Sequence, residues 1–143
     1  MPDGAFEVCI PAATGERVYF TTIFRNKGDR DVTIDRVTAE GENLGGEEHL
    51  VDGLQGQTGT RLGYGAWPTD EPLGGEARVF ARSLPAEGYV VASGDEASLI
   101  SFFEPSQATL DTVVSQIQVE YLVRGRASVE KVHHRYRIAA GDC

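Results

Sequence analysis

The feature that most constrains this sequence is an alternation of apolar and polar residues with a period of two. Between residues 16 and 26, β-branched and aromatic side chains place Val18, Phe20 and Phe24 on one face. Successive side chains of a strand point to opposite faces, whereas a helix repeats its apolar positions every three or four residues. The alternation therefore predicts a β-strand. Sustained helical spacing does not occur, although one helical turn could form within residues 106–114.

Turn residues follow this first strand. The tetrapeptide 26–29, Asn-Lys-Gly-Asp, has the composition of a tight turn, and Val32 and Ile34 then resume the alternation. We expect a β-hairpin here because turn chemistry lies between two alternating runs. Val37 breaks the parity set by Val32 and Ile34, which predicts a β-bulge near residues 35–36.

A second hairpin is indicated near the end of the chain. One face of the first strand would carry Val113, Ser115, Ile117, Val119, Tyr121 and Val123, and one face of the second would carry Val132, His134, Tyr136 and Ile138. A two-residue turn at Arg124-Gly125 places both faces on the same side of the sheet. Glycine in the second turn position suits a type I′ turn.

The middle of the chain is rich in glycine between residues 41 and 75. We expect long loops there, with short strands around His49–Val51 and Arg61–Tyr64. Ordered segments should return at 77–81, 89–92 and 99–103. The last of these is apolar on both faces, which predicts a central strand buried between layers. Pro105 should end it.

About eight or nine antiparallel strands with a long Gly-rich loop region indicate an all-β fold, an immunoglobulin-like β-sandwich. The 143 residues fit a single domain, 1–143. A formal net charge of −9 disfavours nucleic acid as a partner, since nucleic-acid binding depends on Lys and Arg. No apolar run reaches the roughly 20 residues of a membrane-spanning helix, so we expect no direct membrane insertion.

The chain has two cysteines, Cys9 and Cys143, at its opposite ends. Chain termini in compact domains often lie close together, so we expect a disulfide between them, and hence an oxidising compartment. The alternative is two free thiols in a cytosolic protein. The residues Met1-Pro2-Asp3-Gly4 do not resemble an export signal, so a signal or anchor would have to lie outside these residues.

Catalytic motifs are not recognisable. Nucleophile elbows, phosphate-binding loops, zinc-ligand spacings and calcium loops are absent from the sequence, so we predict a protein that is not an enzyme and has no cofactor. Adjacent His133 and His134 would point to opposite faces of a strand and could not readily share a metal ion, so no metal site is expected.

Two groups of residues are candidates for binding. Lys131, His133, Arg135 and Arg137 would form a basic stripe on the outward face of the last strand. This stripe could dock an acidic partner, or it could be a solvated face that discourages edge-to-edge aggregation. Tyr64 and Trp67 lie in a glycine-framed loop, where they could stack on sugars or anchor a protein. Alternatively, Trp67 closes one end of the sandwich.

Residues 24–29 (FRNKGD) and 32–37 (VTIDRV) resemble the F-x-N-x-G … V-T-I-x-x-V hairpin of extracytoplasmic bacterial immunoglobulin-like domains. Together with Trp67-Pro68 after the Gly-rich region, they are similar to ectodomains of uncharacterised actinobacterial surface proteins. The resemblance covers little beyond residues 17–39. It implies a cell-surface location and a role in adhesion, assembly or structure.

These observations lead to one functional hypothesis and one alternative. The hypothesis is a non-catalytic extracytoplasmic interaction or structural module, belonging to a secreted or membrane-anchored bacterial protein, whose partner is another protein or a cell-envelope polymer. The alternative is a small ligand- or carbohydrate-binding β-sandwich that uses the Tyr64–Trp67 loop. A binder of small ligands should have a concave aromatic site, whereas an interaction module should expose a patch.

Overall fold

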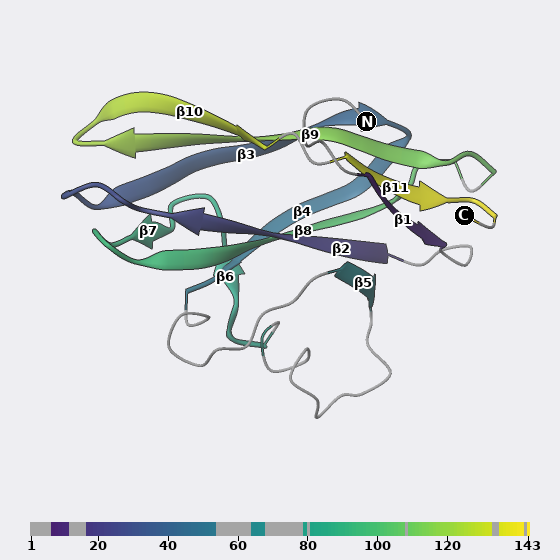
Figure 1. The fold of residues 1–143 in the computed structure, drawn as a ribbon, viewed down its shortest axis with the longest axis horizontal. Helices are drawn as coiled ribbons and strands as arrows, with labels where there is room; N and C mark the ends of the chain where they lie inside the picture. Colours follow the sequence, from purple (N-terminus) through teal and green to yellow (C-terminus); the bar gives the residue numbers. More distant parts are fainter. Residues whose placement is uncertain are drawn as a thin grey trace.

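The computed structural model describes residues 7–11, 17–53, 64–67, 79, 81–107, 109–132, 135–141 and 143, which form two packed β-sheets (Figure 1). The six-stranded sheet has the order β1 (Glu7–Pro11), β11 (Arg135–Ala139), β9 (Thr112–Val123), β3 (Val32–Glu42) and β7 (Val90–Val91), with β10 (Arg126–Val132) also paired to β9. The five-stranded sheet has the order β5 (Tyr64–Trp67), β2 (Arg17–Arg25), β8 (Glu96–Pro105), β4 (Leu44–Asp52) and β6 (Leu84–Pro85).

This arrangement is an immunoglobulin-like β-sandwich, as predicted from the alternation. The described strands number eleven rather than eight or nine. The difference arises because β6 and β7 are only two residues long and because the last predicted strand is divided into β10 and β11. One pair, β1 with β11, is parallel, whereas the prediction was antiparallel throughout.

The core lies between the sheets and consists of the inward residues of both. Phe20 and Phe103 come from the five-stranded sheet and Ile117 and Ile138 from the six-stranded sheet, and all four are fully buried. The ring of Phe20 stacks on Tyr136 across the interface, with 4.0 Å between ring centroids. Packing of this kind makes the alternating faces of the strands the main source of stability.

β8 is buried on both faces, which confirms the interpretation of residues 99–103 as a central strand. Its outer face contributes Ile100 and Phe102 to a second apolar cluster that includes Val79. Val79 lies in a stretch with helical conformation at 79 and 81–82, where an ordered segment was predicted, while residues 106–107 and 109–110 form bends and turns instead of a helix. An ion pair of 2.8 Å between Arg82 and the fully buried Asp52 fastens this stretch to β4.

The predicted hairpin at residues 26–31 is not formed. β2 pairs with β5 and β8, whereas β3 pairs with β7 and β9 in the opposite sheet. The segment between them therefore crosses from one sheet to the other. Period-two alternation is the same for a strand in either sheet, so the sequence pattern could not separate a hairpin from a crossing.

Asn26 replaces the hairpin hydrogen bonds at this crossing. Its side chain, only 5% exposed, donates from Nδ2 to the carbonyls of Arg30 (2.6 Å) and Val91 (3.0 Å). Its backbone N–H donates to the Asp95 carbonyl, and its carbonyl accepts from Gly94 N–H, both at 2.9 Å. The β2–β3 crossing is thus joined to the β7–β8 crossing beside it.

Asn43 performs the same task for the β3–β4 and β8–β9 crossings. It adopts a positive φ of 57°, and its Nδ2 donates to the carbonyls of Gln107 (2.9 Å) and Leu110 (3.0 Å). Gln107 N–H donates to Asn43 Oδ1 at 2.7 Å, and Ser106 N–H donates to the Asn43 carbonyl at 3.0 Å. Asparagine suits this position because it tolerates left-handed backbone and supplies both donors and acceptors.

Two local predictions about turns and bulges are confirmed. The register of β3 against β9 shifts between Ile34 and Arg36, which leaves Asp35 as the extra residue of a bulge. The final hairpin turns at Arg124 (φ 53°) and Gly125 (φ 75°), with Val123 opposite Arg126, as a type I′ turn requires.

A second bulge in β9 was not predicted. Opposite Glu40 and Gly41 the register shifts so that Ser115 is the extra residue, and Ser115 is exposed while Val114 and Ile117 are both fully buried. The prediction that Val113 and Ser115 share the face of Ile117 is therefore wrong. A side chain at Gly41 would collide with the Val113 carbonyl, so glycine permits the close approach of the two strands here.

The disulfide between Cys9 and Cys143 is present, as predicted, with 6.0 Å between the Cα atoms. Cys9 lies in β1, which pairs in parallel with β11, and Cys143 lies shortly after β11. The bridge thus ties the first described strand to the end of the chain.

We expect Asn26→Ala to lower the free energy of unfolding by about 2 to 4 kcal/mol, because it leaves buried carbonyls without donors. Urea unfolding would measure this, with Lys27→Ala, a change at the exposed neighbouring residue, as the matched control. An effect of Asn26→Ala no larger than that of the control would show that the crossing does not depend on this side chain.

Cys143→Ser should lower the free energy of unfolding by about 3 to 5 kcal/mol, since the bridge closes a loop spanning 134 residues in sequence. Thermal unfolding with and without reductant measures the effect, and reductant should change the midpoint of the wild type but not of the variant. An unchanged wild-type midpoint after verified reduction would contradict the proposed stabilisation.

Candidate functional site

Three of the four residues of the predicted basic stripe lie on the outward face of the six-stranded sheet, and residue 133 lies outside the described residues. Lys131 is opposite Gln118 in the β10–β9 pair and is exposed. Arg135 and Arg137 alternate with the buried Tyr136 and therefore point away from the core. This placement agrees with the predicted assignment of faces, while a role in binding stays a prediction.

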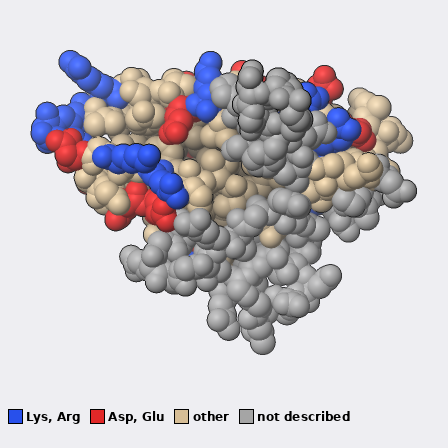
Figure 2. Space-filling model, in the orientation of Figure 1, with Lys and Arg blue, Asp and Glu red and all other residues tan. Residues whose placement is uncertain are grey.

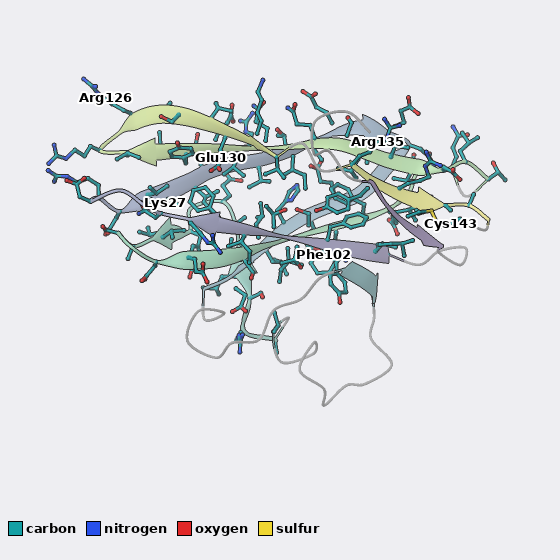
Figure 3. All side chains as sticks on the ribbon, viewed as in Figure 1. Lys27, Phe102, Arg126, Glu130, Arg135 and Cys143 are labelled. Atoms are coloured by element: carbon teal, nitrogen blue, oxygen red, sulfur yellow. A yellow bond between two sulfur atoms is a disulfide. The ribbon has the colours of Figure 1, made fainter. Side chains whose placement is uncertain are left out.

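Arg135 and Arg137 line a pocket of about 760 Å³, and Figure 3 shows Arg135 on β11. The other lining residues are Glu42, Asn43, Gln107, Thr109, Leu110, Asp111 and Val113. Val113 is paired with both Glu42 on β3 and Arg137 on β11, so three neighbouring strands form one wall. Lys131 is not among the lining residues. In the structure, Arg135 and Arg137 therefore belong to one surface pocket, and Lys131 of the predicted stripe lies outside it.

The other wall of this pocket is formed by residues 107 and 109–111, between β8 and β9, and several hydrogen bonds hold these residues in place. Asn43 binds the backbone of Gln107 and Leu110, and Thr112 Oγ1 donates to the Asn43 carbonyl at 3.0 Å. Asp111 Oδ1 accepts from Ala140 N–H at 2.9 Å, which connects the segment to the end of β11. The pocket is therefore formed by backbone that is fixed before any ligand binds.

The chemistry of the pocket is mixed. Two guanidinium groups, from Arg135 and Arg137, share it with the carboxylates of Glu42 and Asp111 and with Leu110, whose side chain is 50% exposed. Guanidinium groups bind carboxylates through paired hydrogen bonds, and an exposed leucine offers apolar contact area. This combination suits a protein surface that carries acidic and apolar groups together.

The second predicted binding group, Tyr64 and Trp67, is in a strand and not in a loop. β5 pairs with β2, with Tyr64 opposite Phe20 and Trp67 opposite Arg17. Pairing along the edge of the five-stranded sheet satisfies backbone groups that a loop would leave to water, which explains the difference from the prediction. The side chains of Tyr64 and Trp67 lie outside what the structure describes, so neither the anchor nor the closing role is tested.

A third arrangement, not predicted from the sequence, joins Glu47, His49 and Ser101. His49 Nδ1 lies 2.7 Å from Ser101 Oγ, and His49 Nε2 lies 2.8 Å from Glu47 Oε1, which also accepts from Ala39 N–H at 2.9 Å. The chain of contacts bridges β4, β8 and β3. Fifty-two residues separate His49 from Ser101, so only the sheet register brings them together.

These three residue types occur together in serine hydrolases, but the geometry here differs. Ser101 is 1% exposed and faces the core beside Phe20 and Phe103, so its hydroxyl cannot meet a substrate. The arrangement instead satisfies polar groups between the sheets. Burial is also the main reason that the pKa of His49 lies below its ordinary value of 6.5, an effect that hydrogen bonding and charge attraction from Glu47 partly oppose.

This lowered pKa predicts a loss of stability in acid. As the pH falls below about 6.5, the unfolded state binds a proton at His49 before the folded state does, so the free energy of unfolding decreases. The loss should be smaller in His49→Gln. We would compare the pH dependence of urea unfolding between the two proteins from pH 7 to pH 5. If the free energy of unfolding of the two proteins changed with pH in the same way, the pKa of His49 would be the same in the folded and unfolded states, which would contradict the prediction.

The fold and the site together define a β-sandwich with a preformed surface pocket. No protein-family model and no curated protein matches the chain. Among solved structures, it is similar to the ASH / PapD-like domain of human CEP192 (PapD-like domain 7), with 12% identity and a TM-score of 0.45 over 93% of this chain and 79% of that chain. Within the described residues, no helix is long and apolar enough to cross a membrane.

Proposed function

We propose that this chain is a non-catalytic interaction module that acts outside the cytoplasm, in a secreted or surface-anchored bacterial protein. The observation that carries the proposal is the Arg135–Arg137 pocket with its fixed wall. It offers two outward guanidinium groups and exposed Leu110 on a rigid scaffold. Charged groups of this kind around an apolar contact are typical of protein interfaces, in which arginine is enriched.

The extracytoplasmic part of the proposal is supported by the Cys9–Cys143 disulfide. Disulfides persist in oxidising compartments and are rare where cytosolic thiol systems keep cysteines reduced. The non-catalytic part is supported by the burial of Ser101, since the hydroxyl in the arrangement most similar to a hydrolytic site is enclosed by the core.

The partner that fits this pocket is another protein with an acidic and apolar surface. Glu42 and Asp111 lie beside the two arginines, so a purely anionic polymer would meet like charges as well as opposite ones. A partner with side chains of both kinds can place a carboxylate near each guanidinium and an apolar group on Leu110. A cell-envelope polymer is the other partner class that the experiment below can identify.

A photo-crosslinking amino acid at position 110 should capture this partner on intact producing cells. The same amino acid at position 90, where Val90 is 51% exposed at the β7 edge, is the matched control. Addition of Arg135→Glu and Arg137→Glu should reduce capture at position 110 about tenfold or more, a loss of about 1.4 kcal/mol or more. Protease sensitivity of the captured species distinguishes a protein from a polymer.

Two further comparisons make the result decisive. Arg30→Glu with Arg36→Glu makes the same charge change at exposed sites outside the pocket and should leave capture unchanged. Equal capture at positions 110 and 90, or capture indifferent to the Arg135 and Arg137 changes, would overturn the proposed site.

A further inference from the structure

β10 is the longest described strand that has a hydrogen-bonded partner on one side only. Five strands of the described topology have a single partner, and the others, β1, β5, β6 and β7, have five, four, two and two residues against seven in β10. β1 covers the edge of β11, but its pairing begins only at Arg135. Residues 126–131 are all exposed, and β10 lies at the rim of the molecule in Figure 1.

The register of the hairpin determines which backbone groups of β10 face outward. In a two-residue turn, Arg126 N–H donates to the Val123 carbonyl, and antiparallel strands then bond to each other at every second residue. The residues bonded to β9 are therefore 126, 128 and 130. The N–H and C=O groups of Ala127, Val129 and Lys131 point away from the sheet, ready to bond a further strand.

Two opposite charges on β10 have no partner in the part of the chain that the structure describes. Arg126 and Glu130, both labelled in Figure 3, take part in none of the ion pairs between described residues. They are opposite Val123 and Val119 on β9, so they lie on the same face of the sheet, four residues apart. Between them on that face is Ser128.

We propose that β10 pairs with β10 of a second copy of this chain, antiparallel, about a two-fold axis at Ser128. In this register Arg126 lies opposite Glu130 of the second copy, and the same ion pair forms a second time by symmetry. Ala127 lies opposite Val129 of the second copy on the other face, again twice, which covers the 50% exposed Val129. The two six-stranded sheets become one continuous sheet.

The charge pattern favours a second copy over a different partner strand. In the sequence Arg-Ala-Ser-Val-Glu, the charges two residues before and two residues after Ser128 are opposite, so two antiparallel copies of β10 attract each other. A strand whose charges served only to prevent association would carry like charges at these two positions. A shift by one residue would place the outward groups of Ala127 opposite Glu130, whose backbone groups already bond to β9, so no ladder could form in that register. Basic side chains project among acidic ones at the end of the molecule where Arg126 lies (Figures 2 and 3), and the two-fold axis places this end of one copy away from the same end of the other.

The interface is confined mainly to one strand pair, which is smaller than the roughly 1,600 Å² of a standard stable interface. The dimer should therefore be weak, with a dissociation constant of about 10 to 1000 µM. This surface is separate from the Arg135–Arg137 pocket, so the proposal does not depend on the function proposed above.

Sedimentation equilibrium over a concentration series of the disulfide-bonded protein tests this pairing. Arg126→Glu and Glu130→Arg should each weaken association at least tenfold, because each places like charges opposite one another twice. The double variant Arg126→Glu/Glu130→Arg should restore it, since the exchanged charges are again complementary. Glu87→Arg, a charge change at an exposed residue beside β7, at the opposite edge of the six-stranded sheet from β10, should have no effect.

Val129→Pro provides a second test that does not rely on charge. Its N–H faces outward, so proline removes a donor to the second copy without removing one to β9, and dimerisation should be lost while the circular dichroism spectrum is retained. A wild type that stays monomeric at millimolar concentration would overturn the proposal. So would a dimer in which the double variant fails to recover the affinity lost by the single variants.

Discussion

The two sheets are joined by chain segments that cross from one to the other, and at each crossing the backbone leaves the hydrogen-bond ladder of a sheet. Buried peptide groups without partners are costly, so a sandwich of this kind depends on what satisfies them. Asn26 and Asn43 do so by binding the backbone of a neighbouring crossing through the side-chain amide. The alternating faces supply the apolar energy, and these two amides satisfy backbone groups where the chain leaves the ladders.

Features that depend on neighbouring residues could be predicted from the sequence. The Asp35 bulge follows from the parity of Val32, Ile34 and Val37, and the type I′ turn follows from a glycine between two alternating runs. Features that depend on distant partners could not. The Ser115 bulge arises from the close approach of Gly41, and the position of β2 and β3 in different sheets depends on which strands compete for each edge.

The same reasoning explains the outcome for the candidate site. The outward direction of Arg135 and Arg137 follows from alternation with Tyr136, so it could be predicted. The wall that makes a pocket of this surface comes from Asn43, which lies 64 residues before Gln107, and no local pattern indicates that contact. The polar chain from Glu47 through His49 to Ser101 was missed for the same reason, because sheet register alone brings its members together.

The Cys9–Cys143 bridge also has a mechanical consequence. The cysteines lie near the two ends of the chain, and their Cα atoms are 6.0 Å apart. A pulling force applied to polypeptide continuing from both ends would pass through this covalent link rather than through the sheets. The strands between the cysteines would bear almost none of the load, so the domain would resist extension until the sulfur–sulfur bond itself was broken or reduced.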